Sequence, residues 1–195
     1  MKRKFLHLTL FFVAFSLSTS AAFAFVFQQA SHKVTQIIIN VSDILRPDGA
    51  GSVTQLTPYG EMVNWQCVDD TSGGDGDSSY VYSSGAGGRD TYQVQNHPSK
   101  TGIISNITVN IRVKRTGFGI GFARTVLRTH GVEYTGNLEV LGSSYSVRSS
   151  TYLKNPFTGG DWTWDEIDDL EIGVRLSSLG GSVRCTQVWL IINLA

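Results

Sequence analysis

The segment 103–115 limits the fold more than any other part of the chain. Apolar residues stand at every second position, namely Ile107, Val109, Ile111 and Val113. Polar residues stand between them, namely Thr108, Asn110, Arg112 and Lys114. A side-chain period of two is that of a β-strand with one buried face and one wet face. The segment therefore predicts a strand of an antiparallel sheet that packs on one side only.

Further short β segments follow one another, with turn residues about every 8–12 positions, which is the spacing of an all-β sandwich or barrel. They are expected at 53–56, 63–68, 80–82, 90–94, 123–129, 132–134, 138–141, 145–152 and 174–176. The last segment, 183–194, is apolar on both faces, which predicts a central strand. Charged residues make up only 16% of the chain and there are 21 glycines, a mixture that favours strands and turns over helices. We predict one all-β domain over 44–195, an antiparallel jelly-roll-like β-sandwich.

One short helix is expected near 164–170. Trp164, Ile167 and Leu170 are three residues apart, which is a helical spacing, and Thr163 with Glu166 forms a capping-box pattern. Trp162 and Trp164 then allow two hypotheses. They form an aromatic platform for a sugar, or they anchor a helix that closes one end of the sandwich.

The N-terminus has the pattern of a signal peptide over 1–24. Three basic residues precede the apolar run 5–17, and Ala22–Ala24 is a small-x-small cleavage site. The alternative is a retained anchor, because 5–27 contains no Asp, Glu, Lys or Arg and is long enough to span a bilayer. Both predict a secreted or cell-surface protein, with membrane contact through this segment alone. Cleavage removes three of the 16 basic residues and none of the 16 acidic ones, which leaves no basic stripe for nucleic acid.

Residues 25–43 form a predicted strand-forming extension. The run 34–41 is rich in Ile and Val and has strong β character. It is either the first strand of the sheet or a strand that adds to the sheet edge of another subunit. The second alternative predicts a homo-oligomer or filament.

Two cysteines, Cys67 and Cys185, both fall in predicted strands. An exported chain passes through an oxidising compartment, so we expect a disulfide between them. The alternative is two buried free thiols.

The loop 69–79 is acidic and rich in glycine. Its carboxylates make it a candidate Ca²⁺ site, although the spacing is not that of an EF-hand. The candidate ligands are Asp69, Asp70, Asp75 and Asp77. The alternative is a solvated acidic loop without a metal.

No catalytic motif is found, and no other cofactor is expected. His32, His97 and His130 are isolated and lack the spacing of a zinc site, and neither a nucleophile elbow nor a P-loop occurs. We therefore assign no catalytic residue and predict that the protein is not an enzyme.

Several blocks of sequence resemble a known type of domain. They include VNWQCVDD, GIISNITVNIRVKR and CTQVWLIIN, and the most specific is WTWDEIDDLEIGV at 162–174. Over 44–194 the chain resembles a largely uncharacterised jelly-roll domain of exported bacterial and archaeal proteins and of phage-associated proteins. The resemblance implies the fold and an extracellular or virion-surface setting, and it supplies no catalytic residues. Cys67 and Cys185 depart from the pattern, which favours a bridge between them.

Two hypotheses about function follow. The first is an exported, non-catalytic structural or interaction protein that assembles through its N-terminal strand. The alternative is a carbohydrate-binding module, for which the aromatic candidates are Trp162, Trp164, Tyr80, Tyr82 and Tyr92. A polysaccharide-cleaving enzyme ranks third.

Overall fold

The computed structural model describes residues 42–71, 73–97 and 100–195. They belong to one of the two units into which the chain divides, Asn40–Ala195. The predicted signal peptide and residues 25–41 of the predicted extension lie outside the described residues. No helix in the described part of the chain is long and apolar enough to cross a membrane.

The described residues form twelve strands and two short helices. The strands are β1 (Ser42–Leu45), β2 (Pro47–Thr54), β3 (Thr57–Tyr59), β4 (Tyr80–Ser83), β5 (Gly88–Val94), β6 (Ile104–Thr116), β7 (Ile120–Thr129), β8 (Val132–Thr135), β9 (Glu139–Leu141), β10 (Ser146–Tyr152), β11 (Glu171–Leu179) and β12 (Ser182–Leu194). The helices are the 3₁₀ turn η1 (Asn64–Cys67) and α2 (Trp164–Asp169).

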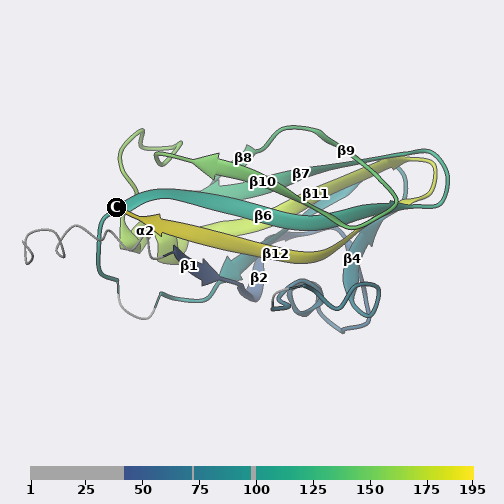
Figure 1. The fold of residues 1–195 in the computed structure, drawn as a ribbon, viewed down its shortest axis with the longest axis horizontal. Helices are drawn as coiled ribbons and strands as arrows, with labels where there is room; N and C mark the ends of the chain where they lie inside the picture. Colours follow the sequence, from purple (N-terminus) through teal and green to yellow (C-terminus); the bar gives the residue numbers. More distant parts are fainter. Residues whose placement is uncertain (1–41, 72, 98–99) are drawn as a thin grey trace, which may run out of the picture. The chain divides into compact units, whose positions relative to one another are not determined.

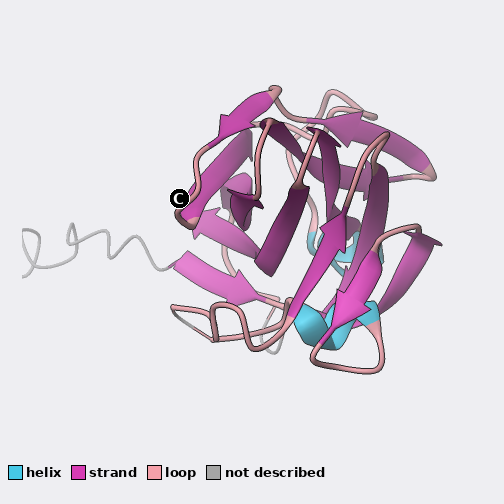
Figure 2. Ribbon diagram, turned by 90° about the vertical axis from the view of Figure 1, so that its right-hand side faces the viewer, coloured by secondary structure: helices cyan, strands magenta, loops and turns pink. Residues whose placement is uncertain are grey.

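The strands make two antiparallel sheets. Sheet A has the order β10-β6-β12-β4-β3 with β1 beside β12, and sheet B has the order β2-β5-β11-β7-β8 with β9 beside β7. The sets β4-β12-β6-β10 and β5-β11-β7-β8 have the strand order of the two sheets of a jelly roll. Figure 2 shows the two layers of strands with the helical segments in cyan. The predicted fold class, a jelly-roll-like β-sandwich with one short α-helix, is confirmed.

Strand β6 has the alternation that its sequence predicts. Its inward side chains, Ile107, Val109, Ile111 and Val113, are fully buried between the sheets. The outward residues are half-buried, with the exception of Asn110. The side-chain oxygen of Asn110 accepts a 2.6 Å hydrogen bond from Ser149 of β10, so this buried amide is compensated.

Strand β12 is central, as its apolar sequence predicts. It pairs with β6 along one side, and with β1 and β4 on the other. Figure 1 shows β6 and β12 running beside each other as the longest strands. The register shifts between Cys185 and Gln187, which leaves Thr186 in a bulge. Strand β12 is therefore hydrogen-bonded to neighbouring strands along both of its edges. Residues 42–43 of the predicted extension are part of β1 and so belong to this sheet.

Gly173 lies inside β11, not at its start. It is buried between Thr91 of β5 and Val126 of β7. A Cβ at this position would collide with the backbone carbonyl of Asp90. The absence of a side chain lets the neighbouring strand approach closely.

One local prediction was wrong. Residues 63–68 do not form a strand, because Asn64–Cys67 is a 3₁₀ turn. The strand predicted at 53–56 begins earlier, since β2 is Pro47–Thr54. The segment 47–54 contains a proline and two glycines, and it becomes a strand only through its pairing with β5.

The predicted disulfide is absent from the structure. Cys67 and Cys185 are both free and fully buried. The Cys67 thiol lies 3.6 Å from the carbonyl oxygens of Tyr59 and Val63, and the Cys185 thiol donates to the carbonyl of Gln187 at 3.2 Å. The prediction placed both cysteines in strands, and it failed because Cys67 is on the 3₁₀ turn η1. The alternative of two buried free thiols describes the structure.

Candidate functional site

Trp162, the first predicted platform residue, is part of the core. Only 4% of its surface is exposed, and its indole N–H donates a 3.1 Å hydrogen bond to the carbonyl of Tyr152. Neither face of this ring is available to a sugar. The alternative hypothesis, an anchor for the closing helix, describes it.

Trp164, the second predicted platform residue, is half-buried at the first position of α2. Its indole N–H donates to the carbonyl of Gly102 at 3.1 Å, and its ring lies against that of His97 with centroids 4.3 Å apart. The capping box predicted for α2 is present, because Thr163 and Glu166 exchange hydrogen bonds. Trp164 therefore holds α2 against the neighbouring loop.

The predicted tyrosine candidates are scattered. Tyr92 is 1% exposed and faces the core, while Tyr80 and Tyr82 lie on the outer face of sheet A. Tyr80 is itself covered, because it stacks on Tyr59 at 4.7 Å and the guanidinium of Arg184 lies 4.3 Å from its ring centroid. These rings do not form one open platform.

The candidate Ca²⁺ ligands do not converge. Within the described residues, which omit Ser72, no group of three or more His, Cys, Asp or Glu side chains could hold a metal ion. Asp77 faces away to Lys114, Arg184 and Tyr145, at 2.6, 3.0 and 3.0 Å. Hydrogen bonds from Lys114 and Arg184 lower the pKa of Asp77. Cations of the protein itself therefore take the place that a metal ion would need.

Two of the other three carboxylates accept hydrogen bonds inside the loop or close to it. Asp70 accepts from the backbone N–H of Asp75 at 3.0 Å, and Asp75 accepts from the Thr186 hydroxyl at 3.2 Å. Burial raises the pKa of both Asp69 and Asp70.

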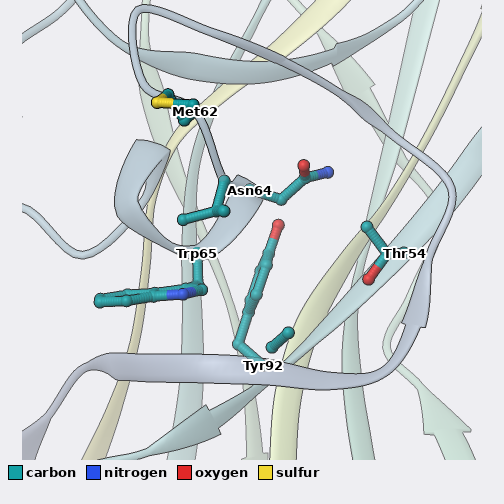
Figure 3. A pocket seen from close by; sticks show the side chains of 7 residues that line it. Thr54, Met62, Asn64, Trp65 and Tyr92 are labelled. Carbon is teal, nitrogen blue, oxygen red and sulfur yellow. The ribbon is translucent and has the colours of Figure 1, made fainter.

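An open pocket lies instead beside η1, at the edge of the sandwich. It has a volume of about 180 Å³. It is lined by Ala50, Thr54, Met62, Val63, Asn64, Trp65 and Tyr92. Met62 is 94% exposed, whereas Tyr92 is buried at the base. Figure 3 shows the Tyr92 ring standing between Trp65 and Thr54, with its hydroxyl directed toward Asn64.

Trp65 differs from the two tryptophans near α2 in one respect. It is half-buried against the core, yet in the described part of the chain no acceptor lies within hydrogen-bond distance of its indole N–H. The Thr54 hydroxyl and the Asn64 side-chain oxygen also lack a partner there. The pocket thus combines an aromatic wall with three polar groups that the protein leaves unused.

A buried carboxylate holds the pocket in shape. Asp90 is 0% exposed and accepts four hydrogen bonds. One oxygen takes the backbone N–H groups of Gln55 and Leu56 at 2.7 and 2.8 Å. The other takes the Asn64 amide at 2.6 Å and the Tyr92 hydroxyl at 3.1 Å. Both side chains are therefore fixed before a ligand arrives.

The same network decides the charge of Tyr92. Burial, followed by the neighbouring Asp90, raises the pKa of Tyr92 well above its ordinary value. The hydroxyl stays protonated and donates to the carboxylate. Tyr92 therefore contributes an uncharged hydroxyl to the pocket.

Sequence reasoning missed this pocket because Val63–Val68 has the composition of a strand. A strand would have turned Trp65 and Cys67 to one face. The segment around Trp65 contains no local signal that would have predicted the 3₁₀ turn in its place.

Comparison with known proteins gives structural similarity alone. No family model matches the chain, and no curated protein matches it. A "xylan-binding module CBM15" is 11% identical, with 80% of this chain and 97% of that chain covered and a TM-score of 0.43.

Two further solved structures are similar to a comparable degree. The CBM22-1 xylan-binding domain of Xyn10C from Paenibacillus barcinonensis is 9% identical over 80% of this chain and 98% of its own, with a TM-score of 0.43. The C-terminal CBM6 of LamC from Zobellia galactanivorans is 16% identical over 78% and 99%, with a TM-score of 0.38. At these values the similarity supports no statement about a ligand of this chain.

Proposed function

We propose that this protein is an exported, non-catalytic glycan-binding protein whose binding site is the pocket between Trp65 and Tyr92. The observation that carries the proposal is the open aromatic pocket in which Trp65, Thr54 and Asn64 each keep an unused polar atom. Of the two hypotheses from the sequence, the carbohydrate-binding alternative thus has the stronger physical support, at a pocket in which Tyr92 is the one aromatic residue that the sequence analysis had named.

The chemistry of the pocket suits a sugar ring. A pyranose has an apolar C–H face and a rim of hydroxyl groups, so it needs an aromatic surface together with separate donors and acceptors. The indole of Trp65 supplies the surface and one donor. The Asn64 oxygen and the Thr54 hydroxyl supply acceptors at the rim. A purely apolar ligand would leave these groups unpaired.

The size of the pocket limits the ligand to one ring. At about 180 Å³ it is smaller than sites for drug-sized ligands, which are roughly 300–1,000 Å³. It therefore suits a single residue of a glycan, such as a chain end. Because Asp90 fixes Asn64 and Tyr92 in advance, little side-chain entropy is lost on binding.

A binding role is better supported than a catalytic one. Glycosidases place two carboxyl groups on either side of the scissile bond. The residues that line this pocket include no Asp, Glu or His. The nearest carboxylate in the network, Asp90, is buried and occupied by four hydrogen bonds. Export is supported by the signal-peptide pattern at 1–24.

The test is a glycan array, followed by calorimetric titration of the best ligand. Trp65→Ala is expected to weaken binding at least roughly tenfold, since an aromatic ring contributes on the order of 1–3 kcal/mol to a stacked nucleobase and a sugar face is expected to behave similarly. Phe118→Ala is the matched control, because Phe118 is 94% exposed on a turn outside the pocket. It is expected to bind within about twofold of the original protein, in keeping with a ring outside the site.

Two results would remove the proposal. One is an array on which no glycan binds. The other is a folded Trp65→Ala variant, checked by circular dichroism, that binds as tightly as the unmodified protein.

A second candidate, self-association, has its own observation. Phe118, Ile120 and Leu179 are 94%, 47% and 68% exposed, and Ile120 is the cross-strand partner of Leu179. They gather where the β6–β7 and β11–β12 turns lie side by side (Figure 1). A contiguous apolar patch of this kind marks an interaction surface.

Light scattering after size exclusion tests this candidate. An oligomer that the double change Phe118→Ser and Leu179→Ser converts to a monomer would support it. A protein that is monomeric at all concentrations would exclude it. Assembly through 34–41 stays a prediction, because those residues lie outside the described ones.

A further inference from the structure

Three arginines stand in one row across the outer face of sheet B. Arg175 of β11 is the register partner of Arg89 on β5 and of Arg124 on β7. The row therefore crosses the three central strands of the sheet. Glu171, opposite Arg128 and Gln93, lies on the same face two rows away, and the row between them, Gly173 with Thr91 and Val126, has no charge.

Like charges placed directly opposite each other destabilise a sheet, so such a row needs compensation. The charge of Arg89 is compensated, because its Nε atom lies 2.6 Å from the carboxylate of Glu133. Arg124 donates to the backbone carbonyl of Gly136 at 2.8 Å, which adds no negative charge. Arg175 is exposed, and within the described residues no carboxylate lies within ion-pair distance of it. The row keeps an excess of two positive charges.

A hollow lies beside the two uncompensated arginines. It has a volume of about 220 Å³. It is lined by Phe122, Ala123, Arg124, Leu138, Arg175 and Ser177. Phe122 and Ser177 are themselves register partners on neighbouring strands. Two arginines, a serine and apolar residues therefore border one small volume.

We propose that this hollow is a second binding site, which takes the anionic group of an acidic sugar, either a carboxylate or a sulfate ester. Guanidinium groups bind both oxyanions with paired, charge-assisted hydrogen bonds. Phe122 and Leu138 cover the apolar face of the ring that carries the anion. The bound anion supplies the negative charge that the row lacks. That the anion is carried on a sugar rests on the proposed function, whereas the anion site itself does not.

Affinity for matched polymers tests the proposal. Dextran sulfate is compared with dextran for the sulfate, and polygalacturonate with its methyl ester for the carboxylate. The charged member of at least one pair is expected to bind at least roughly tenfold more tightly than the neutral one, as is usual for a charge-assisted contact. The pair that shows the difference identifies the anion.

Arg175→Gln is expected to abolish most of this difference. Lys154→Gln is the matched control, because it also removes one positive charge and Lys154 is 61% exposed in a loop beside Asp161. It is expected to leave the difference intact. The free energy of unfolding of the Arg175→Gln variant is measured as well, because it would fall if the role of Arg175 were structural. Arg175→Gln is expected to leave that energy unchanged or raised, because a like-charge contact is relieved.

Several results would overturn the site. They are equal binding of charged and neutral polymers, an equal loss in the Lys154→Gln variant, or a clear destabilisation by Arg175→Gln. Failure of the proposed function appears separately, as a Trp65→Ala variant that still binds the neutral glycan found on the array.

Discussion

The two short helices in the described part of the chain have tryptophans in opposite situations, in or next to them. Helix α2 begins at Trp164 behind a complete capping box, and the indole N–H groups of Trp162 and Trp164 both donate to backbone carbonyls. The turn η1 begins after Val63, which makes no side-chain cap, and the N–H of Trp65 has no acceptor among the described residues.

This difference separates an anchor from a wall of the proposed binding site. A buried indole that reaches a backbone carbonyl has satisfied both its apolar surface and its donor, so nothing remains for a ligand. The indole of Trp65 keeps its donor available to a ligand in the pocket. The neighbouring residues follow the same division, because α2 is closed by protein contacts and η1 borders an open pocket of about 180 Å³.

The largest expected effect is that of Trp162→Ala. Removal of this buried ring is expected to cost about 3–5 kcal/mol of unfolding free energy, because a large core side chain is lost and a cavity remains. Trp65→Ala is expected to cost clearly less, since Trp65 is half-buried at a pocket. Urea denaturation followed by circular dichroism measures both. Equal losses of unfolding free energy in the two variants would contradict the distinction between a core anchor, Trp162, and a pocket residue, Trp65.

Asp90→Asn is expected to cost about 1–3 kcal/mol, the price of leaving buried donors without an acceptor. An amide group cannot accept on its nitrogen, so at least one of the four hydrogen bonds to Asp90 is lost. The pocket should also loosen, and glycan affinity should fall.

Asp161→Asn is the control for this change, since its side chain is 79% exposed. It is expected to alter neither stability nor binding. If Asp90→Asn behaves like the control, then the hydrogen bonds of Asp90 do not hold the pocket in shape. The contrast between the η1 region and the α2 region would then lack a structural explanation.

The fold was predictable because its signals are local and repeated. The alternation from Ile107 to Val113 identified β6, and the two-sided apolar run 183–194 identified the central position of β12. The capping pattern at Thr163 and Glu166 located α2. Each of these signals lies within one segment, so a single sequence contains all of it.

The candidate site was not predictable, because it depends on contacts between distant segments. Asp90 and Asn64 are 26 positions apart, and nothing in either segment indicates that they share a hydrogen bond. The residues around Trp65 have the composition of a strand. That its indole N–H has no acceptor among the described residues can be seen only in the three-dimensional structure. The row of Arg89, Arg124 and Arg175 is likewise a product of strand register. The failed disulfide had the same cause, since it assumed that Cys67 is on a strand.

A smaller effect is expected from the helix caps. Thr163→Ala removes the side-chain acceptor of the Glu166 N–H and is expected to cost about 1 kcal/mol of unfolding free energy.

Val63→Ser gives η1 the N-cap that it lacks, at a residue whose φ of −126° and ψ of 144° suit an N-cap. It is expected to stabilise by a few tenths of a kcal/mol, because a 3₁₀ turn uses a cap less fully. Urea denaturation of both variants tests whether the two helices differ in the way proposed. A loss of stability from Val63→Ser, or no loss from Thr163→Ala, would contradict it.

The smallest effect concerns the thiols, and it reports local opening of the two regions. Burial raises the pKa of Cys185 to about 12 and also raises the pKa of Cys67. At pH 8 the Cys185 thiolate is then on the order of one part in ten thousand, so both thiols should react slowly with a disulfide reagent in the native protein. Cys67 should react first, because it belongs to the uncapped turn η1, whereas Cys185 lies in the central strand β12.

Variants with a single cysteine, Cys67→Ser and Cys185→Ser, assign the two rates. In urea without a reductant, the unmodified chain should show two reactive thiols, since the structure has no bond between them. Faster labelling of Cys185 would mean that the central strand β12 opens before η1, and it would contradict the expectation that the uncapped turn is the less stable of the two regions.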